Sequence, residues 1–433
     1  LFTAVSAQAF AQQQNLTAEL LWKLNRVSAT GLTDDKNNLY YTVTSYDVPA
    51  NKRATRYFNY DLKKGVASEW KQPDGKRIIS RAGNTWYAKN DSVLFRSVDA
   101  GAAWEPLKVN VKGAENIQVS PDGKHIAYSK KVAIIPVNGT ERHPDLPGNT
   151  AQVYTDLHYR HWDSWSDGSF AHVFVAPVDG GTAKDIMQGE PYHTPQSPFG
   201  GAEDFIWNPD SKGILYVCKK KYGKEYAVST NTDLYYYDLS TRQTTNHTEG
   251  MMGYDTEPAF SPDGKMLAWT SMARDGYESD KNDIIITGAV LSANDTARIN
   301  LTAGWDGTVN QFTWDPSGKK IYFTAATRGT IQLFEVTLPV KKRPAAVRQI
   351  TDGKHDITGI TGVAGKEIFV SRTDMNRANE LFAVRADKGT MRAVTTANDS
   401  LYSKIKSSRT ELRLVTTSDN KQMGVWVIYP PDF

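Results

Sequence analysis

Short apolar stretches alternate with polar turns along most of the chain, and one polar phrase recurs before an apolar stretch. Its four clear copies read Ser-Pro-Asp-Gly-Lys or a close variant, at residues 120–124, 208–213, 261–265 and 315–319. Proline presets φ, aspartate hydrogen-bonds its own backbone and glycine adopts a positive φ, so the phrase favours a tight turn. Because apolar residues such as Ile126 and Tyr128 follow at once, each copy predicts a β-hairpin.

The spacing of the phrase indicates a repeat. Asp210, Asp263 and Asp315 mark successive copies and lie about 50 residues apart, which is the length of a four-stranded propeller blade. Weaker copies occur at residues 33–38, 82–84 and 364–366. Seven turns predict an all-β fold, a seven-bladed β-propeller over residues 31–407.

The start of the chain departs from the strand pattern. Residues 15–30 are predicted to form an N-terminal helical segment, with Thr17 as a suitable N-cap. The apolar residues on one face of that helix are Leu20, Leu21 and Leu24. Residues 1–14 are apolar and small, with two Ala-x-Ala triplets, and resemble the residual end of a secretory signal peptide. A plain disordered terminus is the alternative.

Cysteine usage and hydropathy bear on where the protein works. Cys218 is the only cysteine, so the chain cannot form an intrachain disulfide or a cysteine-based zinc site. Export without cysteine pairs favours a periplasmic or secreted protein, with a Gram-negative periplasm as the better fit. No later stretch approaches the ~18 apolar residues of a membrane span, so no membrane partner is expected.

Composition and charge narrow the partners further. Hydrophobic residues make up 39% of the chain and charged residues 23%, which is ordinary for a folded globular protein. The basic runs at residues 219–221 and 341–343 lack a recognition motif, so nucleic-acid binding is not expected. His158 and His161 have i, i+3 spacing, but no third ligand follows at a convincing spacing. The Asp-Gly turns lack the calcium-loop pattern, so we expect neither a metal nor another cofactor.

Residues 133–204 interrupt the period of about 50 residues. The segment is too long for a single blade and is rich in proline, glycine and aromatic residues. Insertions between blade strands emerge at a propeller face, where binding groups concentrate. We therefore interpret this irregular insertion as part blade and part functional loop.

Several phrases outside the turns carry a family likeness. They are residues 159–168, 189–192, 250–255, 271–280 and 425–433. As a set they resemble bacterial dipeptidyl-peptidase V enzymes, of the prolyl oligopeptidase family of serine peptidases. The resemblance implies a secreted exopeptidase that releases dipeptides from peptide N-termini, with a Ser-Asp-His triad in an α/β-hydrolase domain. It also implies a propeller that gates and anchors the substrate, and it leaves open whether the full-length enzyme is a homodimer.

The chain departs from that family in one respect. No G-x-S-x-G nucleophile elbow occurs in the sequence, and no run of alternating strands and helices could build the sheet that displays one. We therefore expect the α/β-hydrolase catalytic domain to be missing here, with no catalytic residue in the chain. Residues 408–433 are expected to start the strand that leads into that domain. The propeller's expected partners are then a peptide substrate and its own hydrolase domain.

Acidic residues are the candidates for substrate binding, because a peptide's α-ammonium loses hydration in a cleft and needs carboxylates there. Glu190 and Glu203 are preferred, and Asp275 and Glu278 lie in a second signature loop. For any one acid the alternative is a solvated turn or a salt bridge, and for a tryptophan it is the core. The full set is Glu190, Glu203, Asp163, Asp275 and Glu278, with Trp162 and Trp165 as walls of the channel.

The sequence leaves a second function open, that of a complete TolB-like periplasmic propeller acting as a protein-interaction scaffold. The end of the chain discriminates between the two functions. A complete propeller should finish on a closed blade, whereas residues 425–429 are an apolar strand with no evident partner. A carbohydrate-active propeller would need two acids in one central pocket, and the signature phrases favour the peptidase instead.

Overall fold

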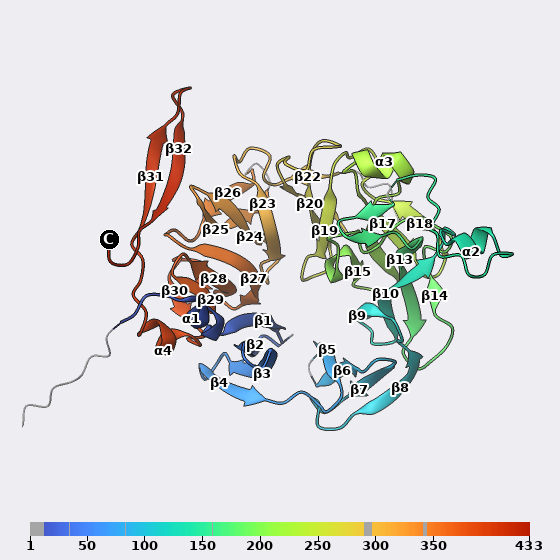
Figure 1. Ribbon diagram of the computed structural model, residues 1–433, viewed down its shortest axis with the longest axis horizontal. Helices are drawn as coiled ribbons and strands as arrows, with labels where there is room; N and C mark the ends of the chain where they lie inside the picture. The colour runs from blue at the N-terminus through green and yellow to red at the C-terminus, as the bar shows by residue number, and fades with distance from the viewer. Residues whose placement is uncertain (1–12, 34, 83, 158, 290–296, 341–343) are drawn as a thin grey trace, which may run out of the picture.

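Seven four-stranded antiparallel sheets stand around a ring (Figure 1). The structure is a computed structural model that describes residues 13–33, 35–82, 84–157, 159–289, 297–340 and 344–433. In each sheet the first strand lies toward the centre of the ring and the fourth toward its rim. The predicted seven-bladed β-propeller is confirmed.

The blades follow one another along the chain. Blades 1 to 3 contain β1 (Arg26–Leu32), β2 (Asn38–Asp47), β3 (Lys52–Asp61), β4 (Val66–Trp70), β5 (Arg77–Ala82), β6 (Thr85–Lys89), β7 (Val93–Ser97), β8 (Glu105–Asn110), β9 (Glu115–Val119), β10 (His125–Ala133), β13 (Ser169–Pro177) and β14 (Lys184–Asp185). Blades 4 and 5 contain β15 (Phe205–Trp207), β16 (Gly213–Cys218), β17 (Asp233–Asp238), β18 (Thr244–Asn246), β19 (Asp255–Phe260), β20 (Met266–Ser271), β21 (Asp283–Gly288) and β22 (Ile299–Asn300). Blades 6 and 7 contain β23 (Val309–Trp314), β24 (Lys320–Thr327), β25 (Thr330–Thr337), β26 (Ala346–Gln349), β27 (Asp356–Ala364), β28 (Glu367–Asp374), β29 (Arg377–Arg385) and β30 (Met391–Ala393).

The recurring phrase forms the turn between the first two strands of a blade. In blade 3, the Ser120 hydroxyl donates to the Asp122 carboxylate at 2.6 Å and accepts from the His125 amide at 2.9 Å. Gly123 has φ of 70°, a conformation that glycine adopts without a steric penalty. Ser261 repeats these contacts in blade 5. The sequence phrase therefore fixes the same hairpin in successive blades.

The innermost strands are bent by bulges. Register shifts interrupt the pairing of β1, β5, β9, β19, β23 and β27 with their neighbours. A bulge adds one residue to a strand and re-aims its side chain. In β19 the bulge lies between Thr256 and Ala259, and Glu257 within it has φ of 54°. That distortion decides where one carboxylate of the candidate site lies.

Hydrophobic clusters fill the seams between blades 2 and 3, 3 and 4, 4 and 5, 5 and 6, 6 and 7, and 7 and 1. Between blades 1 and 2, the described residues place the Arg81 guanidinium 3.9 Å from the ring centroid of Tyr40. The rings of Trp70 and Trp86 lie 5.0 and 5.1 Å from the same guanidinium. A cation held by three aromatic rings therefore joins these two blades.

Side chains close the ring where its first and last blades meet. The Asn398 side chain accepts a hydrogen bond from the Asn25 amide at 2.7 Å and donates one to the Asn25 carbonyl at 3.1 Å. Val27 of blade 1 and Phe369 of blade 7 share one buried cluster. Each four-stranded sheet of the described chain comes from one continuous segment, so packing and these hydrogen bonds hold the seam.

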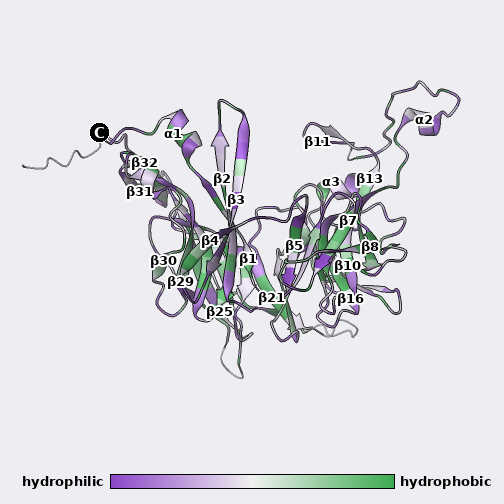
Figure 2. Cartoon of the chain, turned by 90° about the horizontal axis from the view of Figure 1, so that it is seen from below, coloured by the Kyte–Doolittle hydropathy of each residue, from purple (hydrophilic) through white to green (hydrophobic). Residues whose placement is uncertain are grey.

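Two insertions rise from blades 3 and 4. Between β10 and β13 lie α2 (Gly139–Arg142) and a hairpin of β11 (Arg160–His161) and β12 (Ser164–Trp165), and between β16 and β17 lies α3 (Gly223–Val228). Figure 2 shows α2, β11 and the C-terminal end of the chain on the same face of the ring. The structure places two blade strands, β13 and β14, inside the predicted insertion at 133–204.

The first helix is shorter than the sequence pattern predicts. Helix α1 (Ala18–Lys23) begins at the predicted cap, where the Leu20 amide donates to the Thr17 hydroxyl at 3.3 Å. The prediction of a helical segment to residue 30 is wrong, because β1 starts at Arg26 and pairs with β2. Tertiary pairing outweighs a weak helical preference there. Residues 1–12 of the predicted signal peptide lie outside the described residues.

The last strand has a partner that the sequence pattern did not reveal. β32 (Gln422–Ile428) pairs with β31 (Thr410–Thr416) in a hairpin that projects from the ring (Figure 1). The expectation that residues 425–429 lack a partner is therefore wrong. Before this hairpin, α4 (Asp399–Tyr402) follows blade 7. Within the described residues, no helix is long and apolar enough to cross a membrane.

Candidate functional site

Three carboxylates from two neighbouring blades form what we call the acidic group. Glu203 and Asp204 belong to the short 3-10 helix η1 (Ala202–Asp204) that precedes β15, and Glu257 lies in the bulge of β19. Gln118 holds η1 in place, since its amide donates to the carbonyls of Ala202 and Phe205 at 2.7 and 2.6 Å. The bulge and the short helix bring together acids that are far apart in the sequence.

Burial makes two members of the acidic group, Asp204 and Glu257, hard to ionise. It raises the pKa of Asp204 to about 7, against the hydrogen bond from the Gln196 amide, and the charges of Glu203 and Glu257 raise it further. Burial and the charge of Glu203 likewise raise the pKa of Glu257 to about 7. No lysine or arginine acts on either carboxyl among the described residues. A bound cation would relieve this repulsion.

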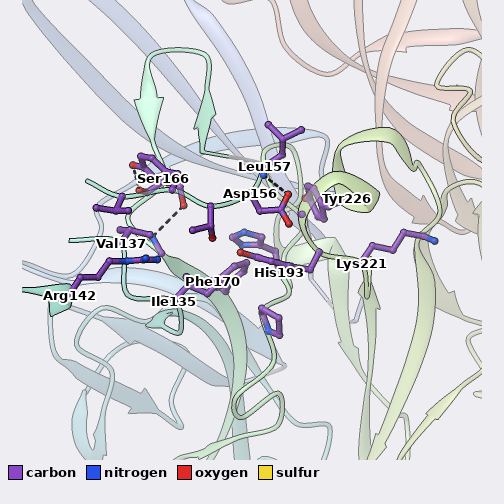
Figure 3. Close-up of a pocket in the computed structure, with 17 residues that line it drawn as sticks. Ile135, Val137, Arg142, Asp156, Leu157, Ser166, Phe170, His193, Lys221 and Tyr226 are labelled. Carbon is purple, nitrogen blue, oxygen red and sulfur yellow. Dashed lines mark hydrogen bonds between the residues drawn. The ribbon is translucent and has the colours of Figure 1, made fainter. Parts of the chain in front are cut away.

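A pocket lies between the blade-3 insertion and α3 (Figure 3). We call it the insertion pocket, and its cavity volume is about 80 Å³. Aliphatic and aromatic side chains form most of its wall, with Arg142, Asp156 and Lys221 as its charged residues. The lining residues are Ile135, Val137, Arg142, Val153, Tyr154, Thr155, Asp156, Leu157, Ser166, Gly168, Phe170, Pro191, His193, Lys221, Tyr222, Gly223 and Tyr226.

One residue joins the insertion pocket to the acidic group. The Gln196 side chain donates to the carbonyl of the pocket residue His193 at 2.7 Å. Its backbone amide donates to the Asp204 carboxylate, also at 2.7 Å. The segment from His193 to Asp204 therefore has one end in the pocket and the other in the acidic group.

Helix α3, which closes one side of the pocket, is held by buried polar contacts. The Lys219 ammonium donates to the Ser229 carbonyl at 2.7 Å, at the C-terminal end of the helix. Asp275 accepts from the Ser229 hydroxyl and the Thr230 amide at 2.7 Å, and from the Asn231 amide at 3.1 Å. Burial alone would raise the pKa of Asp275, but these hydrogen bonds hold it below its ordinary value. Asp275, a predicted substrate contact, thus positions α3.

The other predicted acids lie in three different settings. Glu190 accepts from the Lys220 ammonium at 2.7 Å and is already paired with a cation. Asp163 is exposed at the tip of the β11–β12 hairpin and accepts from the Ser164 hydroxyl at 3.2 Å. Glu278 is exposed and accepts from Tyr254 at 3.5 Å. Of the predicted acids, the structure brings only Glu203 into the acidic group.

Trp162 and Trp165 lie on the exposed side of the insertion and not in the core. Their side chains are 69% and 54% exposed. Trp162 meets Phe199 edge to face at 5.8 Å between ring centroids, and Trp165 stacks on the pocket residue Tyr154 at 6.0 Å. The two rings therefore flank the segment that connects the pocket with the acidic group.

Of the two histidines considered for metal binding, the structure describes only His161. His161 is exposed and its ring packs on Trp162 at 4.6 Å between centroids, while His158 lies outside the described residues. Across the described residues, no group of three or more His, Cys, Asp or Glu side chains is arranged to hold a metal ion.

Sequence analysis missed Glu257 and His193, and it placed Asp204 among the acids of the irregular segment without choosing it as a candidate. Asp204 follows a predicted residue directly, so its place in the irregular segment was a usable signal. Glu257 sits in a strand pattern that gives no sign of the bulge. His193 enters the site because β13 and the segment after β14 lie side by side, as its hydrogen bond with the Ala171 amide shows.

Curated proteins named dipeptidyl-peptidase 5 are similar to this chain in sequence. Dipeptidyl-peptidase 5 of Porphyromonas gingivalis is 35% identical over 434 residues, which covers 97% of this chain and 61% of that protein. This chain is therefore similar to a dipeptidyl-peptidase 5 over almost its whole length. Dipeptidyl-peptidase 5 of Aspergillus fumigatus is 25% identical over 350 residues, covering 72% of this chain and 46% of that protein. The chain thus spans less than two thirds of the length of the relatives it matches, and no family model matches it.

Solved structures share the fold at low identity. The acylaminoacyl peptidase of Pyrococcus horikoshii superposes with a TM-score of 0.64 at 16% identity, covering 94% of this chain and 58% of that one. The β-propeller domain of the trilobed protease from Pyrococcus furiosus gives 0.52 at 14% identity, covering 87% and 97%. This chain therefore shares the propeller fold of these two proteins.

Proposed function

We propose that this propeller anchors the free N-terminus of a peptide for a dipeptidyl-peptidase, with the acidic group as the anchor. The observation that carries the proposal is the set of three carboxylates, Glu203, Asp204 and Glu257, which repel one another without a partner cation among the described residues. A peptide's α-ammonium is a compact cation that would replace this repulsion with charge-assisted hydrogen bonds.

The proposal includes a serine-hydrolase domain as the propeller's partner. Its support is that the matched relatives are longer than this chain, which covers 61% of the P. gingivalis protein, and that those relatives are named as dipeptidyl-peptidases. The blade-3 insertion and the C-terminal end lie on one face of the ring, so a domain that follows the chain would meet the exposed aromatic side chains of that insertion. Gating of the substrate by the ring belongs to the same proposal.

We also propose export to the periplasm, on the strength of the Ala-x-Ala triplets in residues 7–11 and the single cysteine. Fractionation of Gram-negative cells that express the protein from its natural start is the measurement. Recovery in the cytoplasm alone would contradict this part of the proposal.

Anchoring can be measured on the 433-residue chain. A pentapeptide labelled at its C-terminus is compared with its N-acetylated form by fluorescence anisotropy. We expect the peptide with a free N-terminus to bind at least about 10-fold more tightly than the acetylated peptide, because acetylation removes the positive charge that the carboxylates bind. Glu203→Gln should lower the affinity for the free peptide by about 10-fold and leave the acetylated peptide unchanged.

A matched variant separates the anchor from general surface charge. Glu278→Gln removes the same charge from another exposed glutamate in a second loop of the predicted site, and we expect no more than about a threefold effect. Equal affinity for the free and acetylated peptides would contradict the proposal. So would a Glu203→Gln protein that still discriminates between them as the unmodified chain does.

A further inference from the structure

Several polar groups in the wall of the insertion pocket already have hydrogen-bond partners within the protein. The Tyr154 hydroxyl donates to the Ser166 carbonyl at 2.7 Å, and the Tyr226 hydroxyl donates to the Ser197 carbonyl at 2.9 Å. Nδ1 of His193 accepts from the Ala171 amide at 3.2 Å. A ligand entering the pocket would therefore meet ring faces and aliphatic carbons over most of the wall.

His193 is held in its neutral form. Because Nδ1 accepts a backbone hydrogen bond, the ring proton resides on Nε2. Burial lowers the pKa of this histidine to about 4, so no positive charge develops on it near neutral pH. The charged residues of the pocket are Arg142, Asp156 and Lys221, and the first two are exposed side chains.

Two glycines set the shape of the pocket. A Cβ on Gly168 would lie 1.9 Å from the Ile135 carbonyl oxygen, and one on Gly223 would lie 2.2 Å from the Asp156 carboxylate. Both glycines have positive φ, of 75° and 62°, which disfavours any other residue. Close approach of the backbone at these points lets the insertion and α3 form opposite walls of the pocket.

We propose that the insertion pocket binds an apolar side chain, aliphatic or aromatic, of the N-terminal residue of the peptide substrate. The inference rests on the proposed function, because it takes the ammonium of that residue to lie at the acidic group. Gln196 bonds both His193 in the pocket and Asp204 in the acidic group, at 2.7 Å each, so the two sites lie within one residue of each other. Exposed aromatic rings continue from the pocket outward, since Trp165 stacks on Tyr154.

Physical chemistry favours an uncharged occupant. An apolar side chain gains by leaving water in proportion to the surface it buries. A charged one would lose hydration in a wall whose hydroxyls are already bonded and whose histidine is neutral. The pocket would therefore select among dipeptidyl substrates by their first side chain, while the acidic group binds only the α-ammonium.

The test measures affinity of the 433-residue chain for five labelled pentapeptides that differ only at the first residue: Phe, Leu, Gly, Asp or Lys. We expect Phe and Leu to bind at least about 10-fold more tightly than Gly, and Asp and Lys to bind no more tightly than Gly. Val153→Phe should fill the pocket and reduce the Phe-to-Gly ratio to within about threefold. The Val153 amide bonds the Val137 carbonyl at 2.8 Å, which keeps the backbone in place.

Control variants distinguish filling of the pocket from misfolding, and they distinguish the pocket proposal from the anchoring proposal. Val66→Phe adds the same bulk to a 60% exposed valine in β4 and should leave the ratio unchanged. Val153→Leu is a milder filling that should reduce the ratio in part, and circular dichroism checks the fold of each variant. A Phe-to-Gly ratio near one in the unmodified chain, or one that survives Val153→Phe in a folded protein, overturns the inference. If the unmodified chain binds free and N-acetylated peptides equally but keeps its preference for Phe over Gly, only the anchoring proposal is overturned.

Discussion

Two acidic regions in and next to blade 5 place the same residue types in opposite environments. In the loop between β20 and β21, Asp275 accepts three hydrogen bonds and Asp280 pairs with Arg274, so the pKa of each carboxyl is below its ordinary value. In the acidic group, burial and like charges raise the pKa of Asp204 and Glu257 to about 7. The first region stabilises the fold by being ionised, and the second destabilises it.

The difference separates a positioning role from a binding role. A carboxylate whose hydrogen bonds are already satisfied has little capacity left for a ligand, whereas buried acids without a cation gain most from binding one. Asp275 therefore serves the site indirectly, by holding α3 through Ser229 and Thr230. The three predictions below test this contrast.

The largest effect should follow Asp275→Ala. The variant leaves the Ser229 hydroxyl and the Thr230 backbone amide without their acceptor, and the Asn231 amide keeps only its hydrogen bond to the Ser229 hydroxyl. Since Ser229 and Thr230 are buried, we expect the free energy of unfolding to fall by about 3 kcal/mol. Urea denaturation followed by tryptophan fluorescence measures it.

A conservative control accompanies that variant. Asp275→Asn keeps the accepting oxygen and should lose less than about half as much stability. A stable Asp275→Ala protein that no longer distinguishes free from N-acetylated peptide would reverse our assignment and make Asp275 the anchor.

The next effect is a pH dependence of stability with opposite signs in the two regions. Asp204 ionises near pH 4 in the unfolded chain and near pH 7 in the folded protein. Between these values the folded state binds more protons, so stability from this group falls as the pH rises. Asp204→Asn should therefore stabilise the protein at pH 8 by on the order of 2 kcal/mol and have little effect at pH 4.

Asp275 supplies the internal comparison for the pH experiment. The pKa of Asp275 is lowered in the folded protein. Its contribution to the free energy of unfolding is therefore fully present above the ordinary carboxyl pKa, and it is lost as the pH falls through the pKa of the folded protein. Asp275→Asn should therefore destabilise the protein more at pH 7 than at pH 3. If Asp204→Asn shows the same stability difference at pH 4 and pH 8, the acidic group is not strained as described.

The smallest effect should follow Glu190→Gln. The variant removes the partner of the Lys220 ammonium, which stays packed on the Tyr235 ring at 4.7 Å from its centroid. We expect a loss of about 1 kcal/mol in stability and less than a threefold change in peptide affinity. Lys220→Met is the matched variant from the other side of the pair. A tenfold loss of affinity for the free peptide in Glu190→Gln alone would return Glu190 to the list of anchors.

The fold could be predicted further than the site. The turn phrase acts locally, because Ser261 and Gly264 in blade 5 repeat the hydrogen bonds and backbone conformation of Ser120 and Gly123 in blade 3. Glu203 could be singled out because it lies in the segment that breaks the period. The ion pair of Glu190 could not be foreseen, because Lys220 belongs to the segment after β16 and lies 30 residues away in the sequence.

The sequence by itself determined the seven blades, their inner hairpins and the position of the irregular insertion, because proline, aspartate and glycine act within a few residues of the chain. Only the tertiary structure decided which acids meet. The bulge of β19 turns Glu257 toward Glu203 and Asp204, and the loop after β20 satisfies Asp275 through blade 4. These outcomes depend on burial and on contacts between distant segments. Such contacts set the pKa of a carboxylate and its remaining hydrogen-bonding capacity, and the local sequence pattern does not reveal them.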